Sequence, residues 1–139
     1  MSGVETLPRV LILDSEAVSA LAEKREGMAE RLTAAQQADH RVVIPTVVLA
    51  EVATGALSDA AIWHLLGRIP TVDLPDGVSM RAGALRTRAD RVRRKRRDLT
   101  VDAIVAATAV QLAPSVVITA DPSDLELLVD GFDVKVSEV

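Results

Sequence analysis

The sequence predicts an α/β protein of three layers, in which helices cover both faces of a central parallel sheet of four to five strands. The first observation is that short aliphatic runs alternate with longer segments of helical pattern along the chain. The second is composition: aromatic residues make up only 1% of the chain, so Val, Leu, Ile and Ala must fill the core. Such a core suits α/β layers better than a β-sandwich.

Strands are predicted where the aliphatic runs are continuous, because a strand buried on both faces shows no alternation of apolar and polar residues. Four runs have this character, and a fifth is a candidate for a terminal strand. They cover residues 9–13, 41–44, 71–74, 115–119 and, for the fifth, 132–136.

Helices are predicted for the segments between these runs. They cover residues 15–25, 27–38, 46–54, 58–67, 76–96, 99–112 and 123–129. Pro45 follows a strand and Thr46 can cap the next helix, while Pro114 ends the last long helix before its strand. No linker, repeat or low-complexity segment interrupts the 139 residues, so we expect a single domain over residues 1–139.

Composition also excludes several kinds of site. The chain has no cysteine and two histidines, His40 and His64, so disulfides are excluded and a zinc site would rest mainly on carboxylates. No apolar stretch approaches the roughly 18 residues that a membrane span needs, and no basic segment followed by an apolar run opens the sequence. We therefore expect a soluble, cytoplasmic protein without membrane contact.

Two aspartates directly follow predicted strands. Asp14 follows "VLIL" and Asp121 follows "VVITA". Since ligands of open α/β sheets bind beyond the carboxyl ends of the strands, both acids stand where a ligand would bind. Each aspartate taken alone is equally well read as a helix N-cap, because each precedes a predicted helix.

Two further acids lie on apolar helical segments. Glu51 stands in "PTVVLAEVATG", where the alternative is that its turn simply faces water. Asp102 stands early in "VDAIVAATAV", where the alternative is a favourable interaction with the helix dipole. If these helices pack toward the same rim, the four carboxylates would repel one another and require a cation. Oxygen ligands without Cys or His favour Mg²⁺ or Mn²⁺.

Four segments of the chain resemble, in order and character, the acidic motifs of PIN-domain ribonucleases, and bacterial VapC-type toxins are the most similar group. The segments are LILDSEAVSAL, PTVVLAEVATG, VDAIVAATAV and VVITADPSDLELL, and the likeness runs from about Arg9 to Val136. The resemblance implies a PIN-like fold and a metal-dependent endoribonuclease that acts as the toxin of a type II toxin–antitoxin pair. It also implies a cognate antitoxin as partner, RNA as substrate, and a homodimer.

The resemblance further implies which residues form the site. It places four acids in a catalytic quartet that binds Mg²⁺ or Mn²⁺ and activates a water for hydrolysis of the RNA phosphodiester bond. These are Asp14, Glu51, Asp102 and Asp121.

Flanking positions match supporting ones in the family. Asp124 is expected to add to the metal site, and Ser15 and Thr119 to support the metal or the water. The chain departs from the family at Leu125, where an aromatic residue is common. Asp98, four residues before Asp102, is read as a cap rather than a ligand.

A basic segment precedes the Asp102 helix. Nine of the sixteen basic residues lie between positions 81 and 97, although the formal net charge is −4. The segment is open to three interpretations: a solvated helix, a surface for RNA phosphates, or a site for an acidic antitoxin tail. We favour RNA because the segment leads directly into the Asp102 helix. The expected RNA-binding residues are Arg93, Arg94, Arg96 and Arg97.

Two other classes of function compete with the nuclease. A phosphotransfer site with a nucleophilic Asp14 fits less well, because Glu16 stands where phosphatases need a second aspartate and Lys135 is the only late lysine. A binding module for RNA or protein, with a vestigial metal site, is the remaining alternative. Metal binding distinguishes the module from the nuclease.

Overall fold

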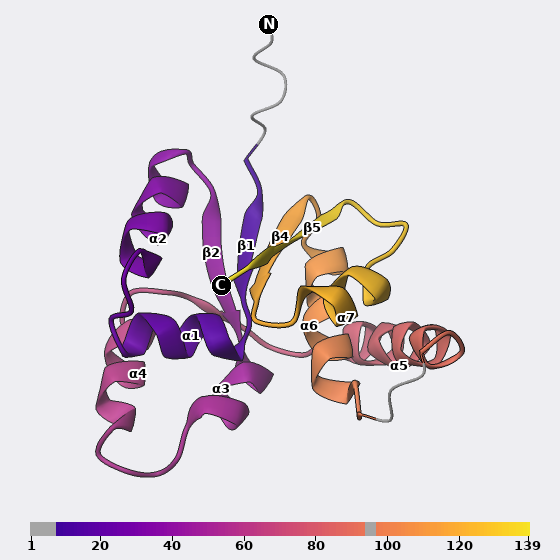
Figure 1. Ribbon diagram of the computed structural model, residues 1–139, viewed down its shortest axis with the longest axis horizontal. Coiled ribbons are helices and arrows are strands. Elements are labelled where there is room, and N and C mark those ends of the chain that lie inside the picture. Colours follow the sequence, from indigo (N-terminus) through magenta and orange to yellow (C-terminus); the bar gives the residue numbers. More distant parts are fainter. Residues whose placement is uncertain (1–7, 94–96) are drawn as a thin grey trace, which may run out of the picture.

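The computed structural model describes residues 8–93 and 97–139, and its strands form one five-stranded parallel sheet (Figure 1). The order across the sheet is β3-β2-β1-β4-β5, and every neighbouring pair is parallel. The strands are β1 (Val10–Leu13), β2 (Arg41–Pro45), β3 (Thr71–Val72), β4 (Ser115–Thr119) and β5 (Val134–Glu138). This sheet confirms the predicted fold class.

Helices cover both faces of the sheet and complete the three layers. The helices are α1 (Ser15–Ala22), α2 (Met28–Gln37), α3 (Thr46–Val52), α4 (Asp59–Leu66), α5 (Asp76–Asp90), α6 (Thr100–Gln111) and α7 (Pro122–Leu128). The helices α1, α2 and α4 pack together on one side, and α5, α6 and α7 pack together on the other (Figure 1). None of the helices within the described ranges is long and apolar enough to cross a membrane.

The core is aliphatic, as the composition predicts. Ile12 and Leu13 of β1, Val43 of β2 and Val105 of α6 are fully shielded from solvent. Each such side chain contributes about 1.5–3 kcal/mol by leaving water. Helix α6 packs against both β1 and β4, which makes it the central helix of its layer.

Two strand ends meet at one rim. Leu13 pairs with Ile118, and the backbone N–H of Asp14 donates to the Ile118 carbonyl at 3.0 Å, so β1 and β4 finish side by side. The strand order reverses at this point, since the chain leaves β1 toward β2 on one side and later places β4 on the other. Ligands bind at such switch points in open α/β sheets.

Several boundaries differ from the predicted ones: helix α1 ends at Ala22 rather than at residue 25, and strand β3 ends at Val72 rather than at residue 74. Helix α5 ends at Asp90, not at residue 96, because the chain turns after Arg91 and the Arg93 side chain is directed into the protein. Helix α2 begins one residue late because Gly27 has a φ of 87°, a left-handed conformation outside the helix. Strand β5 begins at Val134, two residues later than predicted.

Candidate functional site at the carboxyl ends of β1 and β4

Asp14 is held in place from two sides at the end of β1. Its Oδ1 accepts the N–H of Ser15 at 2.8 Å, which caps α1, and its Oδ2 accepts the hydroxyl of Thr119 at 2.8 Å. The residue is only 6% exposed. The two readings of Asp14 are therefore compatible, because one oxygen caps the helix while the carboxylate is fixed beside the end of β4.

Glu51 reaches the same rim from α3. The Ser15 hydroxyl donates to Glu51 Oε1 at 2.9 Å and lies 3.4 Å from Asp14 Oδ1. Helices α1 and α3 pack against each other, which brings this contact about. Ser15 thus links an exposed acid to a buried one, and the solvent side of Glu51 stays open.

Asp102 lies in the first turn of α6, where it is 8% exposed. Burial raises the pKa of Asp102 to about 6; the positive charge of Arg97 opposes the rise, and the carboxylates of Asp14, Asp124 and Glu51 add to it. The carboxylates of Asp14, Asp124 and Glu51 are thus near enough to Asp102 for their charges to act on it. A cation placed among them would relieve their repulsion.

Asp121 stands between β4 and α7. Burial acts to raise the pKa of Asp121, but hydrogen bonds from Ser123 and Asp124 and the charge of Arg97 outweigh it, so the pKa lies below its ordinary value. The Ser123 hydroxyl donates to Asp121 Oδ1 at 3.1 Å, and the backbone N–H of Asp121 donates to the Thr119 hydroxyl at 3.2 Å. Thr119 therefore contacts both strand-end aspartates.

Arg97 connects Asp102 to Asp121. Its Nη2 donates to Asp102 Oδ2 at 2.6 Å, and its Nη1 donates to Asp121 Oδ2 at 3.1 Å. The Arg97 side chain remains 53% exposed, whereas that of Asp102 is 10% exposed. A single guanidinium thus bridges two carboxylates and offsets part of their negative charge.

Arg93 and Asp124 form a buried ion pair behind this bridge. Arg93 Nε lies 3.2 Å from Asp124 Oδ1 without the alignment of a hydrogen bond, and Nη2 donates to Oδ2 at 3.3 Å. Their side chains are 5% and 7% exposed. Arg93 Nη1 also donates to the Arg97 carbonyl at 2.8 Å, so this buried arginine anchors the backbone that carries Arg97.

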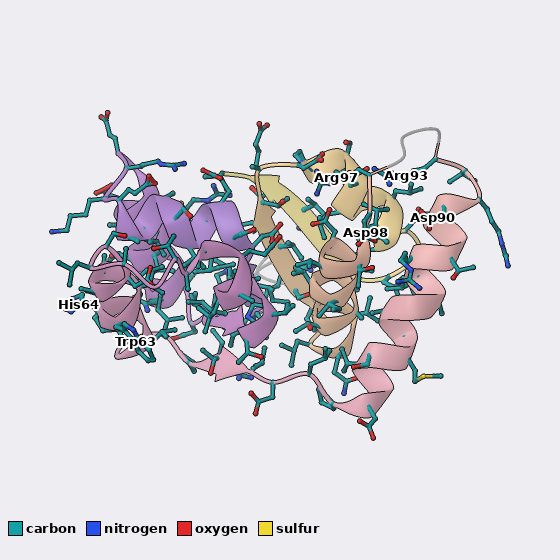
Figure 2. All side chains as sticks on the ribbon, turned by 90° about the horizontal axis from the view of Figure 1, so that it is seen from below. Trp63, His64, Asp90, Arg93, Arg97 and Asp98 are labelled. Atoms are coloured by element: carbon teal, nitrogen blue, oxygen red, sulfur yellow. The ribbon has the colours of Figure 1, made fainter. Side chains whose placement is uncertain are left out.

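The arginines expected to bind RNA are thus placed differently from one another. Figure 2 shows Arg93 and Arg97 together beside α7 and the start of α6, at the far end of the molecule from Trp63 and His64. A phosphate contact by Arg93 would require its buried pair to open, whereas Arg97 is accessible. Arg94 and Arg96 lie outside the described residues.

Asp98 and His40 have structural contacts. Asp98 accepts the hydroxyl of Thr100 at 2.8 Å and its N–H at 3.1 Å, so it binds the first residue of α6, although the N-cap residue itself is Leu99. These bonds lower the pKa of Asp98. His40 Nδ1 accepts the backbone N–H of Arg9 at 2.8 Å, away from the acids.

The acids fit a hard divalent cation in their chemistry, because every donor is a carboxylate or hydroxyl oxygen. In residues 8–93 and 97–139, no three acidic or histidine side chains are grouped closely enough to hold a metal as they stand. Instead, Arg97 lies between Asp102 and Asp121 and donates to both, and the Ser15 hydroxyl donates to Glu51.

Comparison with known proteins places this arrangement in context. The sequence profile of the PIN domain matches residues 11–126. No match was found among curated protein sequences. Three solved structures that are similar to this chain come from bacteria.

The first is VapBC2 from Rickettsia felis bound to a DNA fragment from its promoter, with a TM-score of 0.74, 15% identity, and coverage of 94% of this chain and 98% of that one. DNA-bound VapBC from Salmonella typhimurium gives a TM-score of 0.72, 18% identity, and coverage of 95% and 98%. A toxin–antitoxin complex from Klebsiella pneumoniae gives a TM-score of 0.65 at 21% identity, with coverage of 89% of this chain and 94% of that one. At these identities the likeness establishes the fold.

Proposed function

Because the chain belongs to the PIN domain family, we propose that it is a metal-dependent endoribonuclease and the toxin of a type II toxin–antitoxin pair. The observation that carries the proposal is that two linked pairs of acids lie at the switch point of the sheet: Ser15 contacts Asp14 and Glu51, and Arg97 bridges Asp102 and Asp121. The similarity to VapBC structures over nearly the whole chain supports an antitoxin as partner.

The metal proposed for this site is Mg²⁺ or Mn²⁺, held by the four acids with Asp124 beside them. An ion of this kind lowers the pKa of a bound water and neutralises charge at a phosphate under attack. The chain itself fixes the ligands: Thr119 and Ser15 orient Asp14, and Ser15 directs Glu51 toward it. Exposed Glu51 and half-exposed Arg97 border the open side, where an RNA phosphate would approach.

Mn²⁺ should stabilise the protein against heat, because a ligand that binds only the folded state adds stability by mass action. We expect one cooperative unfolding transition, as for one domain over residues 1–139, and a rise of the midpoint with MnCl₂. The rise should be larger at pH 7 than at pH 5, because burial raises the pKa of Asp102 to about 6 and a proton competes with the metal below that value. Differential scanning calorimetry across both pH values measures this.

The controls use two ligand variants and one matched acid. Glu51→Ala and Asp102→Ala should shrink the Mn²⁺ increment, whereas Asp59→Ala, which removes an acid that accepts hydrogen bonds from Thr54 and Gly55 outside the site, should not. The second candidate function, a binding module with a vestigial site, is favoured by the bridging Arg97 and predicts no increment at all. A shift that is equal in all variants would place the metal elsewhere.

The proposed RNA surface lies beside the acids, where Arg97 is exposed and the basic run precedes α6. Changing Arg94, Arg96 and Arg97 to glutamine should flatten the salt dependence of RNA binding, by a slope of about 0.7 per lost contact on a single strand. Filter binding in an Asp14→Asn background measures this without cleavage. An unchanged slope together with a looser antitoxin complex would instead assign the arginines to the antitoxin.

A homodimer is the proposed assembly. Large apolar side chains stay exposed on the described surface. The exposed fractions of Leu57, Trp63 and Met80 are 96%, 73% and 78%. Such side chains are candidates for burial between subunits. Sedimentation equilibrium at micromolar concentration tests this, and a monomer there would count against it.

A further inference from the structure

We propose that Arg97 is an internal counter-ion of the acidic site, which a divalent cation must displace before it can bind. Arg97 and the metal are then alternative occupants of the same pair of carboxylates, Asp102 and Asp121. This inference rests on the metal site of the proposed function, and it adds a competitor that the chain itself supplies.

The geometry makes the two occupants mutually exclusive. Two nitrogens of one guanidinium contact one oxygen of each acid, at 2.6 Å to Asp102 Oδ2 and 3.1 Å to Asp121 Oδ2. A magnesium ion requires carboxylate oxygens at about 2.0–2.1 Å in near-octahedral order. A metal and a guanidinium that share these oxygens would also place two positive charges next to each other, so the arginine has to leave.

The backbone of Arg97 is held in place, whereas its guanidinium is exposed. Its carbonyl is held at 2.8 Å by Arg93, whose own side chain is buried against Asp124. Its guanidinium side chain, by contrast, is 53% exposed and contacts only the two carboxylates among the described residues. Because the side chain is exposed and the backbone is held, rotamer changes alone can take the guanidinium away from the two acids.

A metal must replace the positive charge that Arg97 supplies. The four acids need a positive charge nearby, and Arg97 supplies one unit where a divalent ion supplies two. Hydrogen bonds to charged groups in such pairs are strong enough that losing them changes an equilibrium by about tenfold. Part of the metal's binding free energy is therefore spent on removing Arg97.

The test compares Arg97→Gln with a matched control, Arg25→Gln, in the full chain. Arg25 also bridges two carboxylates, those of Glu16 and Glu23, with a side chain 44% exposed, but on α1 and the loop after it. We expect isothermal titration with MnCl₂ to give about tenfold tighter binding for Arg97→Gln and a lower melting temperature without metal. The control should bind Mn²⁺ as the wild type does.

The outcomes separate this inference from the proposed function. If Arg97→Gln lowers the melting temperature but leaves Mn²⁺ affinity unchanged, Arg97 is only structural and the inference is overturned while the metal site stands. If neither protein binds Mn²⁺, both proposals fail. If Asp102→Asn binds Mn²⁺ as tightly as the wild type, the metal lies elsewhere and the inference again fails.

A second measurement uses the wild-type protein and does not depend on the folding of a glutamine variant. The Nε–H resonance of Arg97 in ¹⁵N NMR is identified by its loss in Arg97→Lys. Saturation with Mg²⁺ should shift this resonance toward that of a solvent-exposed arginine, because the guanidinium leaves Asp102 and Asp121. A bound Mg²⁺ that leaves the resonance unchanged contradicts displacement.

Discussion

Replacing Asp14 with asparagine should abolish RNA cleavage and leave the fold intact. Asparagine caps helices as well as aspartate does, so the contact to the Ser15 N–H survives. The negative charge is lost, and with it one of the ligands proposed for the metal. Since removal of a residue that merely supports a ligand costs about 10–100-fold, we expect a loss of at least about 100-fold in cleavage rate.

Cleavage of a labelled RNA by purified protein measures this effect, and circular dichroism checks the fold. Glu16→Gln is the matched control, because Glu16 lies two residues away on the same helix and pairs with Arg25 outside the site. It should retain activity. Without metal, Asp14→Asn should melt no lower than the wild type, because it removes one of the repelling charges. An Asp14→Asn protein that cleaves normally would falsify the role of this residue.

Replacing Arg93 with methionine should destabilise the protein by about 3–5 kcal/mol, the cost typical of removing one partner of a buried ion pair. Asp124 would be left 5% exposed without its counter-ion. Chemical denaturation in urea, without metal, measures the change in the free energy of unfolding. The same change releases the Arg97 carbonyl, so the segment before α6 should also become more accessible to proteases.

Two further variants show whether loss of the Arg93–Asp124 ion pair causes the destabilisation. Arg91→Met changes an exposed arginine two residues away and should cost no more than about 0.5 kcal/mol. The double change Arg93→Met with Asp124→Leu removes both charges and should recover much of the loss, because an apolar pair of similar volume leaves no charge buried alone. An Arg93→Met protein as stable as the wild type would show that the pair does not hold the segment.

Much of the fold follows from sequence because its signals are local. Continuous aliphatic runs identified the strands, and the sheet is parallel and five-stranded as predicted. The prediction failed at the end of α5, where no glycine or proline occurs between Gly83 and Pro114 to stop a helix. There the decisive contact joins Arg93 to Asp124, 31 residues away, and no local pattern reveals it.

The acids of the candidate site were also recognisable, since two follow strands and two lie on apolar helices. What sequence could not reveal is their internal partners. Arg97 was expected on a basic surface, yet it bridges Asp102 and Asp121. Its position just before the Asp102 helix was the one available signal. To interpret that signal one must know that α5 ends before residue 93, and that end depends on the contact between Arg93 and Asp124.

The hydrogen bond between Thr119 and Asp14 has a consequence for synthesis of the protein. These two residues are 105 positions apart, and β4, which carries Thr119, is one of the two neighbours of β1. At a translation rate of about 5–20 residues per second, a ribosome needs roughly 5–20 s to add that length of chain. During this interval the nascent chain lacks Asp121, and until residue 102 is added it lacks Asp102 as well, so its proposed site is incomplete. A protein proposed to cut RNA would therefore remain harmless to the messenger that encodes it until translation of this region is finished.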